Sequence, residues 1–235
     1  MRRFISLIAC AVKLLSNSFP DMRIFFLTLL LCLLSACANN HCIALKDDPA
    51  AWQVLQDAWQ DQQVLMILRH AAKCDEEPGC VEDNEDLAPL GKMQAKVIGN
   101  GVRDTLGEPF DVYHSDMIRT KDTALLAFGA STVDVKISKP CLPGFKDHVS
   151  NLPISTNTIL VTHSSCIDSL VDREGERYLG LKSGDDAHFG IAAFMQQNPI
   201  NELKVLGCVW PKDWPELIHS VLAPIAAEQR NDKRL

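Results

Sequence analysis

The sequence predicts an α/β fold, a three-layer α/β/α sandwich around a mostly parallel central sheet. Two short runs are typical of parallel strands that are buried on both faces: 64–68, which is continuously apolar, and 158–162, which is apolar between two threonines. Segments with helical spacing of apolar residues alternate with these and with weaker strand-like runs. The chain has 235 residues, 47% of them hydrophobic, which is enough for one domain with a sizeable core.

The first expected elements of this domain are a helix and a buried strand. Asp48 can cap a helix that begins at Pro49, because proline suits the first helical turn. Trp52, Leu55 and Trp59 follow as an apolar stripe that should face the core. The strand 64–68 comes next and leads at its carboxyl end into Arg69 and His70. Reactive side chains in open α/β sheets commonly lie at this edge.

Helices and strands are expected to alternate along the rest of the chain. In order, we expect a helix over 93–106, a strand over 111–114, a helix, a strand over 133–137, the strand 158–162, strands at 189–195 and 203–210, and a closing helix after 213. Ser115 can cap the helix after the second strand. The strand over 133–137 is expected to be half-exposed, because apolar and polar residues alternate in it.

The amino terminus predicts an export signal. The apolar run 24–34 is too short to span a bilayer comfortably and is typical of a signal-peptide core. Residues 34–37 directly after it resemble a bacterial lipobox, in which Cys37 becomes the lipidated first residue. Translation is then expected to start at Met22, and an extended signal that starts at Met1 is the alternative. A transmembrane anchor over 24–36 is the other alternative.

On this interpretation the chain has three parts: a signal region over 1–37, a polar tether over 38–48 and one catalytic domain over 49–235. Acyl chains on Cys37 would hold the exported protein on a bacterial membrane. Ala38 after the lipidated cysteine favours the outer membrane, facing the periplasm, in a Gram-negative organism. The formal net charge of −7 argues against a nucleic-acid partner. We expect a monomer.

Nine cysteines are present, two of them in the signal region besides Cys37. The cysteines that remain are Cys42, Cys74, Cys80, Cys141, Cys166 and Cys208. An even number in an exported chain predicts disulfides. Cys74 and Cys80 bracket a short acidic loop and could close it, while the other pairings stay open. Zinc binding is the alternative, but the Cys and His residues lack metal-finger spacing, so no metal and no cofactor are expected.

Three segments carry reactive side chains at plausible loop positions. Arg69 and His70 follow one buried strand, Ser115 and Arg119 lie near a helix start, and His163 follows the second buried strand. Neither the glycine-rich phosphate loop of NTPases nor the nucleophile elbow of serine hydrolases occurs in the sequence. A site built on two histidines and two arginines is therefore expected.

At these residues the sequence resembles the histidine phosphatase superfamily, the phosphoglycerate mutase-like proteins. The Arg-His signature, a Ser-x-x-x-Arg-x-x-x-Thr-Ala segment and a second strand-end histidine occur in the family's order, and Ser115, Arg119, Thr123 and Ala124 fill the middle pattern. Within the superfamily, the chain is most similar to exported lipopolysaccharide core heptose phosphatases. These proteins also carry Arg-His-Ala, a cysteine-bracketed loop and cysteines near the later motifs.

The resemblance implies a histidine phosphatase-like fold and a metal-independent phosphomonoester hydrolase. His70 is expected to attack phosphorus and form a phosphohistidine, which water then hydrolyses. Arg69 and Arg119 are expected to clamp the phosphoryl oxygens, because guanidinium groups stabilise the charge spread over them. We expect His163 to contact the same oxygens as a charged donor, and Ser115 and His114 to bind substrate.

The chain departs from the family pattern at the proton donor for the leaving group. The residues 141–145, where many members carry a glutamate, contain no acid, and Ser164 follows the second histidine where another branch has one. Asp147, Asp168 and the acidic residues of 76–86 are the candidates, and an absent donor would favour substrates with good leaving groups.

The expected partners are phosphorylated small molecules. The resemblance to the heptose phosphatase subgroup implies envelope phosphosugars among them. A cytoplasmic-type phosphoglycerate mutase or protein phosphohistidine phosphatase is one alternative, and residues 22–37 count against it. The other alternative is a catalytically weak phosphate- or phosphosugar-binding envelope lipoprotein. The missing acid favours that binding protein, whereas the presence of both histidines and both arginines argues for the enzyme.

Overall fold

The structure is a computed structural model that describes residues 42–74, 80, 86–141, 144–153, 155–170, 188–197 and 203–220. The chain divides into two compact units, Met1–Asn39 and Asn40–Leu235, and the described residues all belong to the second. The signal region and Cys37 therefore lie outside the described residues. In the part that is described, no helix has the length and apolar character needed to cross a membrane.

A six-stranded sheet forms the centre of the domain, in the order β3-β2-β4-β1-β5-β6. Strands β1, β2, β3 and β4 are mutually parallel, and β5 is antiparallel to both of its neighbours. The sheet is thus mostly parallel, as predicted. The strands are β1 (Val64–Arg69), β2 (Phe110–His114), β3 (Thr132–Val133), β4 (Asn157–Thr162), β5 (Ala192–Gln197) and β6 (Leu203–Val209).

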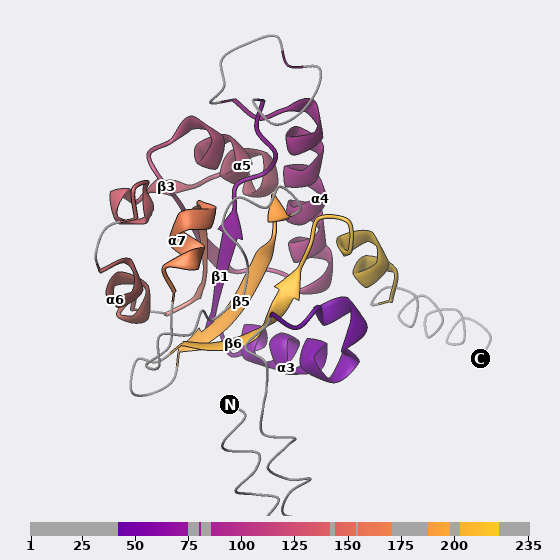
Figure 1. Cartoon of the computed structure of the whole chain (residues 1–235). Helices are drawn as coiled ribbons and strands as arrows, with labels where there is room; N and C mark the ends of the chain where they lie inside the picture. The colour runs from indigo at the N-terminus through magenta and orange to yellow at the C-terminus, as the bar shows by residue number, and fades with distance from the viewer. Residues whose placement is uncertain are drawn as a thin grey trace, which may run out of the picture. The chain divides into compact units, whose positions relative to one another are not determined.

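Helices cover both faces of this sheet, which confirms the predicted three layers (Figure 1). Alternate residues of β1 point to opposite faces, so Met66 packs in one apolar cluster and Ile67 in another. The first cluster includes side chains of α3, α4 and α5, and the second includes side chains of α6 and α7. The helical elements are η1 (Leu45–Asp47), α3 (Pro49–Gln60), α4 (Pro89–Thr105), α5 (Ile118–Phe128), η2 (Val135–Ile137), α6 (Phe145–Ser150) and α7 (Ser164–Asp168), and residues 214–220 are also helical.

The start of α3 follows the predicted signals. The Asp48 side chain accepts a hydrogen bond from the backbone N–H of Ala51 at 2.9 Å, and Pro49 is the first helical residue. The stripe expected to face the core is buried, with Leu55 and Trp59 almost fully enclosed. Trp59 packs edge-on against Phe194 of β5, so this helix is held against the centre of the sheet.

Two sequence predictions about local structure are wrong. The strand expected over 133–137 is only the two-residue β3, because Asp134 accepts a hydrogen bond from Lys136 N at 2.9 Å and starts the turn η2. Ser115 does not cap α5, which begins at Ile118 with Met117 at its N-cap position and no side-chain cap. The Ser115 hydroxyl bonds side chains of the candidate site instead.

The described part of the expected tether, residues 42–48, belongs to the folded body. Ile43 O accepts a hydrogen bond from Cys208 N at 2.7 Å, and Ala44 forms a parallel bridge with Cys208. Cys42 forms a disulfide with Cys208, and the Leu45 side chain is buried. The stretch is mostly polar in the sequence, but Ile43 and Ala44 pair with Cys208 of β6.

All six cysteines outside the signal region form disulfides. The pairs are Cys42–Cys208, Cys74–Cys80 and Cys141–Cys166, with Cα–Cα distances of 5.6, 5.3 and 5.1 Å. These distances lie in the normal range for disulfides. The closure of the acidic loop by Cys74 and Cys80 is confirmed, and the structure supplies the two pairings that the sequence left open.

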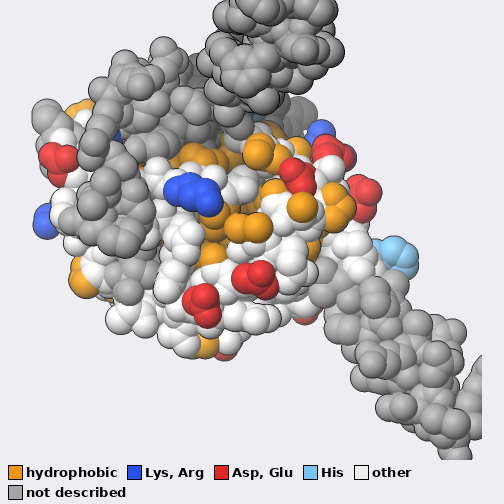
Figure 2. Space-filling view, turned by 90° about the horizontal axis from the view of Figure 1, so that it is seen from below, with side chains coloured by type: hydrophobic (Ala, Val, Ile, Leu, Met, Phe, Trp, Pro, Cys, Tyr) orange, Lys and Arg blue, Asp and Glu red, His pale blue; other side chains and the backbone are white. Residues whose placement is uncertain are grey.

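The two ends of the strands differ in what they present. Strand β1 points upward in Figure 1, so the view from below in Figure 2 faces the amino ends of β1 and its parallel neighbours. Apolar side chains gather near the middle of this face, with a basic side chain beside them (Figure 2). Arg69, His70, Ser115 and His163 lie at the opposite, carboxyl end.

Candidate active site

Three neighbouring parallel strands bring the candidate residues together. Strands β2, β4 and β1 lie side by side, and their carboxyl ends lead into Ser115, His163 and His70 respectively. Backbone hydrogen bonds fix these exits: His70 N donates to Thr162 O at 3.0 Å, and Ser115 N donates to Val161 O at 3.1 Å. The sheet register thus places the motifs next to each other at the edge where α/β folds usually bind ligands.

His70 is buried, and a backbone contact defines which of its ring nitrogens carries the proton. Its Nδ1 lies 2.8 Å from Ala71 O, and a carbonyl oxygen only accepts, so Nδ1 carries a proton. Burial first, and then the positive charges nearby, hold the pKa of His70 well below its usual range. The ring is therefore neutral at neutral pH, and its lone pair lies on Nε2.

The loop after His70 is fixed by α5 and α4. Thr123 Oγ1 accepts a hydrogen bond from Ala71 N at 3.1 Å and donates to Arg119 O at 2.7 Å. Gly91 lies where the backbone of the two segments meets, because a Cβ there would be 2.0 Å from Ala72 O. Thr123 belongs to the family-like segment, and the structure shows that it joins the nucleophile's loop to the helix that carries Arg119.

His163 lies beside His70, with ring centroids 5.4 Å apart. Its Nδ1 is 3.5 Å from Arg119 Nη2, which has no acceptor, so Nδ1 accepts and Nε2–H donates to Ser115 Oγ at 2.8 Å. Burial, and then the charges of Arg119, Lys139 and Arg69, lower the pKa of His163 to about 3. In this structure His163 is therefore neutral, contrary to the charged donor expected from the sequence.

Ser115 continues this network as a hydrogen-bonding relay. Its hydroxyl lies 2.7 Å from Thr120 Oγ1, which in turn donates to Met117 O at 2.7 Å. Both hydroxyl groups are completely buried. In the described residues the Ser115 side chain contacts His163 and the turn before α5, and its role in substrate binding stays a prediction.

Arg119 lies between the two histidines and is buried. It donates from Nε to His70 Nε2 at 3.3 Å, and from Nη2 to Met117 Sδ at 3.0 Å and to His163 Nδ1 at 3.5 Å. These three acceptors are neutral, and a thioether is a weak one. A phosphoryl oxygen is a stronger acceptor for a guanidinium, so a bound phosphomonoester would take over these donors and release the Nε2 lone pair.

Arg69 forms the other side of the site. The guanidinium carbon of Arg69 lies 3.8 Å from the ring centroid of Phe189, and the side chain is buried. His114, by contrast, directs Nδ1 to Ser115 O at 2.6 Å. In the part of the chain that the structure describes, the His114 ring makes this contact with the backbone and no hydrogen bond to His70 or His163. His114 therefore lies beside the site without a direct link to these two histidines.

Two residues that contribute to the site were not identified by any sequence motif. Lys139, on the loop after η2, lowers the pKa of His163 by its charge. Phe189 stacks on Arg69 and also packs against His70. Neither residue belongs to a motif. Lys139 lies on a loop, and Phe189, which was expected to begin a strand over 189–195, lies in the turn before β5.

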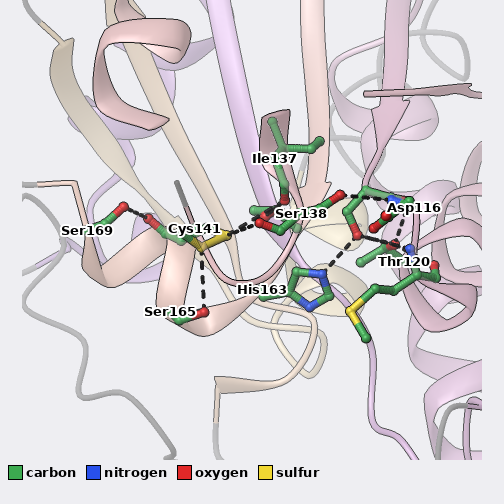
Figure 3. The surroundings of a disulfide bond; sticks show 12 residues. Asp116, Thr120, Ile137, Ser138, Cys141, His163, Ser165 and Ser169 are labelled. Carbon is green, nitrogen blue, oxygen red and sulfur yellow. Dashed lines mark hydrogen bonds between the residues drawn. A yellow bond between two sulfur atoms is a disulfide. The ribbon is translucent and has the colours of Figure 1, made fainter. Parts of the chain in front are cut away.

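A disulfide supports the helix that begins at His163. Cys166 N donates to His163 O at 3.1 Å, and Cys166 is bonded to Cys141 (Figure 3). The loop between η2 and Cys141 is also tied to the site, because Ser138 Oγ accepts a hydrogen bond from Asp116 N at 3.1 Å. The disulfide therefore connects the segment carrying Lys139 to the segment carrying His163.

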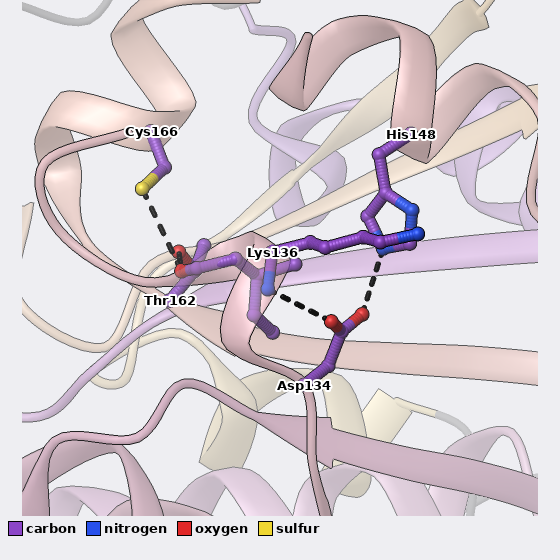
Figure 4. A network of polar contacts seen from close by, with 6 residues as sticks. Asp134, Lys136, His148, Thr162 and Cys166 are labelled. Carbon is purple, nitrogen blue, oxygen red and sulfur yellow. Dashed lines mark hydrogen bonds and ion pairs between the residues drawn. The ribbon is translucent and has the colours of Figure 1, made fainter. Parts of the chain in front are cut away.

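The same loop is anchored to β4 from behind. Thr162 Oγ1 donates to Ile137 O at 2.7 Å, and His148 Nε2 lies 2.7 Å from Asp134 Oδ2 (Figure 4). His148 is thus engaged by a carboxylate away from the two histidines of the site. Among the proton-donor candidates, Asp147 is exposed on α6 and Asp168 ends α7, while most of 76–86 lies outside the described residues. The described residues contain no cluster of His, Cys, Asp and Glu that could hold a metal ion.

The fold is histidine phosphatase-like. The two histidines follow the ends of β1 and β4, Arg69 ends β1, and Arg119 lies on α5. A solved structure of the protein histidine phosphatase SixA complexed with tungstate is similar to it: TM-score 0.51, 14% identity, covering 64% of this chain and 98% of that one. A mutant phosphoserine phosphatase from Entamoeba histolytica, in complex with phosphoserine, matches with TM-score 0.44 and 12% identity over 64% of this chain and 98% of that one. No protein-family model and no curated protein sequence matches the chain.

The depressed pKa of His163 predicts a loss of stability in acid. In the unfolded chain this imidazole has a pKa of about 6.5. Between that pH and 3 the unfolded state is protonated at His163, whereas the folded state is not. Stability is therefore complete above pH 6.5 and declines as the pH falls toward 3. From pH 7.5 to pH 5, His163 should lower the free energy of unfolding by about 2 kcal/mol.

This prediction is checked by urea unfolding of the wild type and of His163→Asn at both pH values. The variant lacks the titrating group, so its free energy of unfolding should fall by less than that of the wild type, with a difference of about 2 kcal/mol. An equal fall in both proteins would show that His163 is not held neutral by the fold.

Proposed function

We propose that this chain is a metal-independent phosphatase that hydrolyses phosphomonoesters through a phosphohistidine on His70. The observation that carries this proposal is the state of His70: a buried, neutral imidazole whose Nε2 lone pair faces Arg119. All the charged groups that shift the pKa of His163 are cations, so the site favours an anionic ligand. A phosphomonoester is the anion that a neutral nucleophile and two guanidinium groups suit best.

The reaction would proceed in two displacements at phosphorus. In the first, the Nε2 lone pair of His70 forms a P–N bond while the P–O bond to the leaving group breaks, and the departing oxygen takes a proton from solvent. In the second, water attacks phosphorus, the P–N bond breaks and its electrons return to Nε2, and inorganic phosphate leaves. Arg69 and Arg119 would stabilise the equatorial oxygens in both steps.

The location that we propose is the bacterial envelope, with the protein anchored through a lipid on Cys37. The signal-like run and the lipobox-like residues 34–37 support export. Three disulfides in the folded domain support an oxidising compartment, because disulfides are rare in most cytosols. Envelope phosphosugars are the substrate class we propose, on the similarity of the sequence to the lipopolysaccharide core heptose phosphatases.

Phosphate release tests this function. The purified full-length chain should release inorganic phosphate from an aryl phosphate and from phosphorylated sugars, at a rate that a metal chelator does not change. Faster turnover of heptose phosphates than of the aryl phosphate would support the envelope substrate. If the chain binds phosphosugars but turns none over, the enzyme proposal fails and the binding lipoprotein replaces it.

A further inference from the structure

Phe189 lies between the two residues that would do the chemistry. Its ring centroid is 3.8 Å from Arg69 Cζ and 5.5 Å from the centroid of the His70 ring, and its side chain is buried. One aromatic side chain thus contacts the flat face of the guanidinium and one side of the imidazole. Phe189 is outside every motif in the sequence and is not one of the polar residues expected to act.

The ring is placed by the backbone of the residues that it supports. Arg69 N donates to Ile191 O at 3.1 Å, and Gly190 N donates to His70 O at 3.2 Å, so the turn before β5 is joined to the end of β1. Gly190 has φ +68°, and a Cβ there would be 2.7 Å from the Pro211 side chain. The turn therefore needs glycine next to Phe189 and has little freedom to move the ring.

Behind this turn, β6 provides a second attachment. Trp210 Nε1 donates to His188 Nδ1 at 3.4 Å, and the two rings pack with centroids 6.4 Å apart. His188 directly precedes Phe189, so both neighbours of Phe189 in the chain are fixed. The platform under Arg69 and His70 is therefore part of the rigid sheet edge.

We propose that Phe189 is a positioning residue that holds Arg69 and His70 in the geometry for phosphoryl transfer. A guanidinium stacked on an aromatic face keeps its N–H edges free to point at phosphoryl oxygens. The ring also limits rotation of His70, so that Nε2 stays aligned toward phosphorus. This role rests on the proposed function, because it deepens the same site.

The test is the affinity for inorganic phosphate, measured by calorimetry on the full chain. Phe189→Leu keeps an apolar side chain but removes the aromatic face, so phosphate should bind about tenfold more weakly. Phe189→Tyr keeps the face and should restore wild-type affinity. Phe194→Leu is the matched control, because Phe194 is buried in the same strand region but packs on Trp59 and Trp214; it should lower thermal stability and leave phosphate affinity unchanged.

A fluorinated phenylalanine at position 189 provides a variant that keeps the shape of the side chain if Phe189→Leu does not fold. Fluorine withdraws the negative charge from the ring face, so phosphate affinity should fall while the unfolding temperature stays the same. Wild-type phosphate affinity in this variant or in Phe189→Leu would overturn the proposal, as would an equal loss in Phe194→Leu. If the wild type binds phosphate without turnover, only the proposed function is contradicted. If the wild type binds no phosphate, both the proposed function and the role of Phe189 are contradicted.

Discussion

Replacement of His70 by alanine should lower kcat/KM for phosphomonoester hydrolysis roughly 10⁴-fold or more, because the covalent route is lost. The Nε2 of His70 is the nucleophile of the proposed mechanism, and the bond from Nδ1–H to Ala71 O leaves the lone pair on Nε2. Arg69, Arg119 and His163 would still bind phosphate in the variant, so its affinity for inorganic phosphate should change far less than its turnover.

Trapping the intermediate provides the direct measurement. A wild-type reaction stopped with alkali should carry a phosphoryl group on His70, which mass spectrometry of the digested protein can locate. His219→Ala is the matched control, since His219 is an exposed histidine on the last helical segment, and it should keep full activity. Phosphorylation of another residue, or more than a few per cent of the activity in His70→Ala, would contradict the proposed mechanism.

Much of the architecture could be predicted because it depends on simple patterns. Strand β1 is apolar from Val64 to Leu68 and β4 from Ile159 to Val161, and such runs are typical of strands buried on both faces. Asp48 and Pro49 predict the start of α3 because they are a helix cap and a first-turn proline, and tertiary contacts do not override these local signals. Once two parallel strands are recognised, their carboxyl ends must lie together, and this is why the pairing of His70 with His163 could be anticipated.

The errors come from places where a longer-range contact competes with the local pattern. Val133 and Val135 alternate with Asp134 as in a strand, but the Asp134 carboxylate bonds the next turn and His148, and the strand stops. Ser115 has the right residue type and position for a helix cap, yet its hydroxyl group forms a hydrogen bond with His163. A single sequence does not show which of two available partners a polar side chain will choose.

The protonation of His163 is a further property that no motif contains. The expected charge followed from its presumed contact with phosphoryl oxygens, whereas burial and three cations on separate segments lower the pKa of His163 to about 3. Lys139 and Phe189 likewise enter the site from loops, where spacing carries no information about distance. The sequence therefore indicates which residues gather at the strand ends, and the fold determines their charge and orientation.

Arg119→Ala should lower kcat/KM about 10³-fold, because this guanidinium contacts both histidines and is the donor best placed for phosphoryl oxygens. Its effect should fall on phosphate affinity as well as on kcat, unlike the effect of His70→Ala. Arg119→Lys should recover only a small part of the loss, since an ammonium cannot reach His70, His163 and the phosphoryl group with one planar fork. Steady-state kinetics and phosphate calorimetry on both variants measure these effects.

Removal of Arg119 also changes the electrostatics that keep the histidines neutral. Its positive charge lowers the pKa of His163, so in Arg119→Ala that pKa should rise from about 3 toward the usual value. An NMR titration of the His163 ring would detect the shift. Arg103→Lys is the matched control, because Arg103 lies on α4 and bonds Ala127 O at 2.7 Å. Wild-type kinetics in Arg119→Ala would exclude this arginine as a clamp. An unchanged His163 titration would show that burial, and not the charge of Arg119, keeps this imidazole neutral.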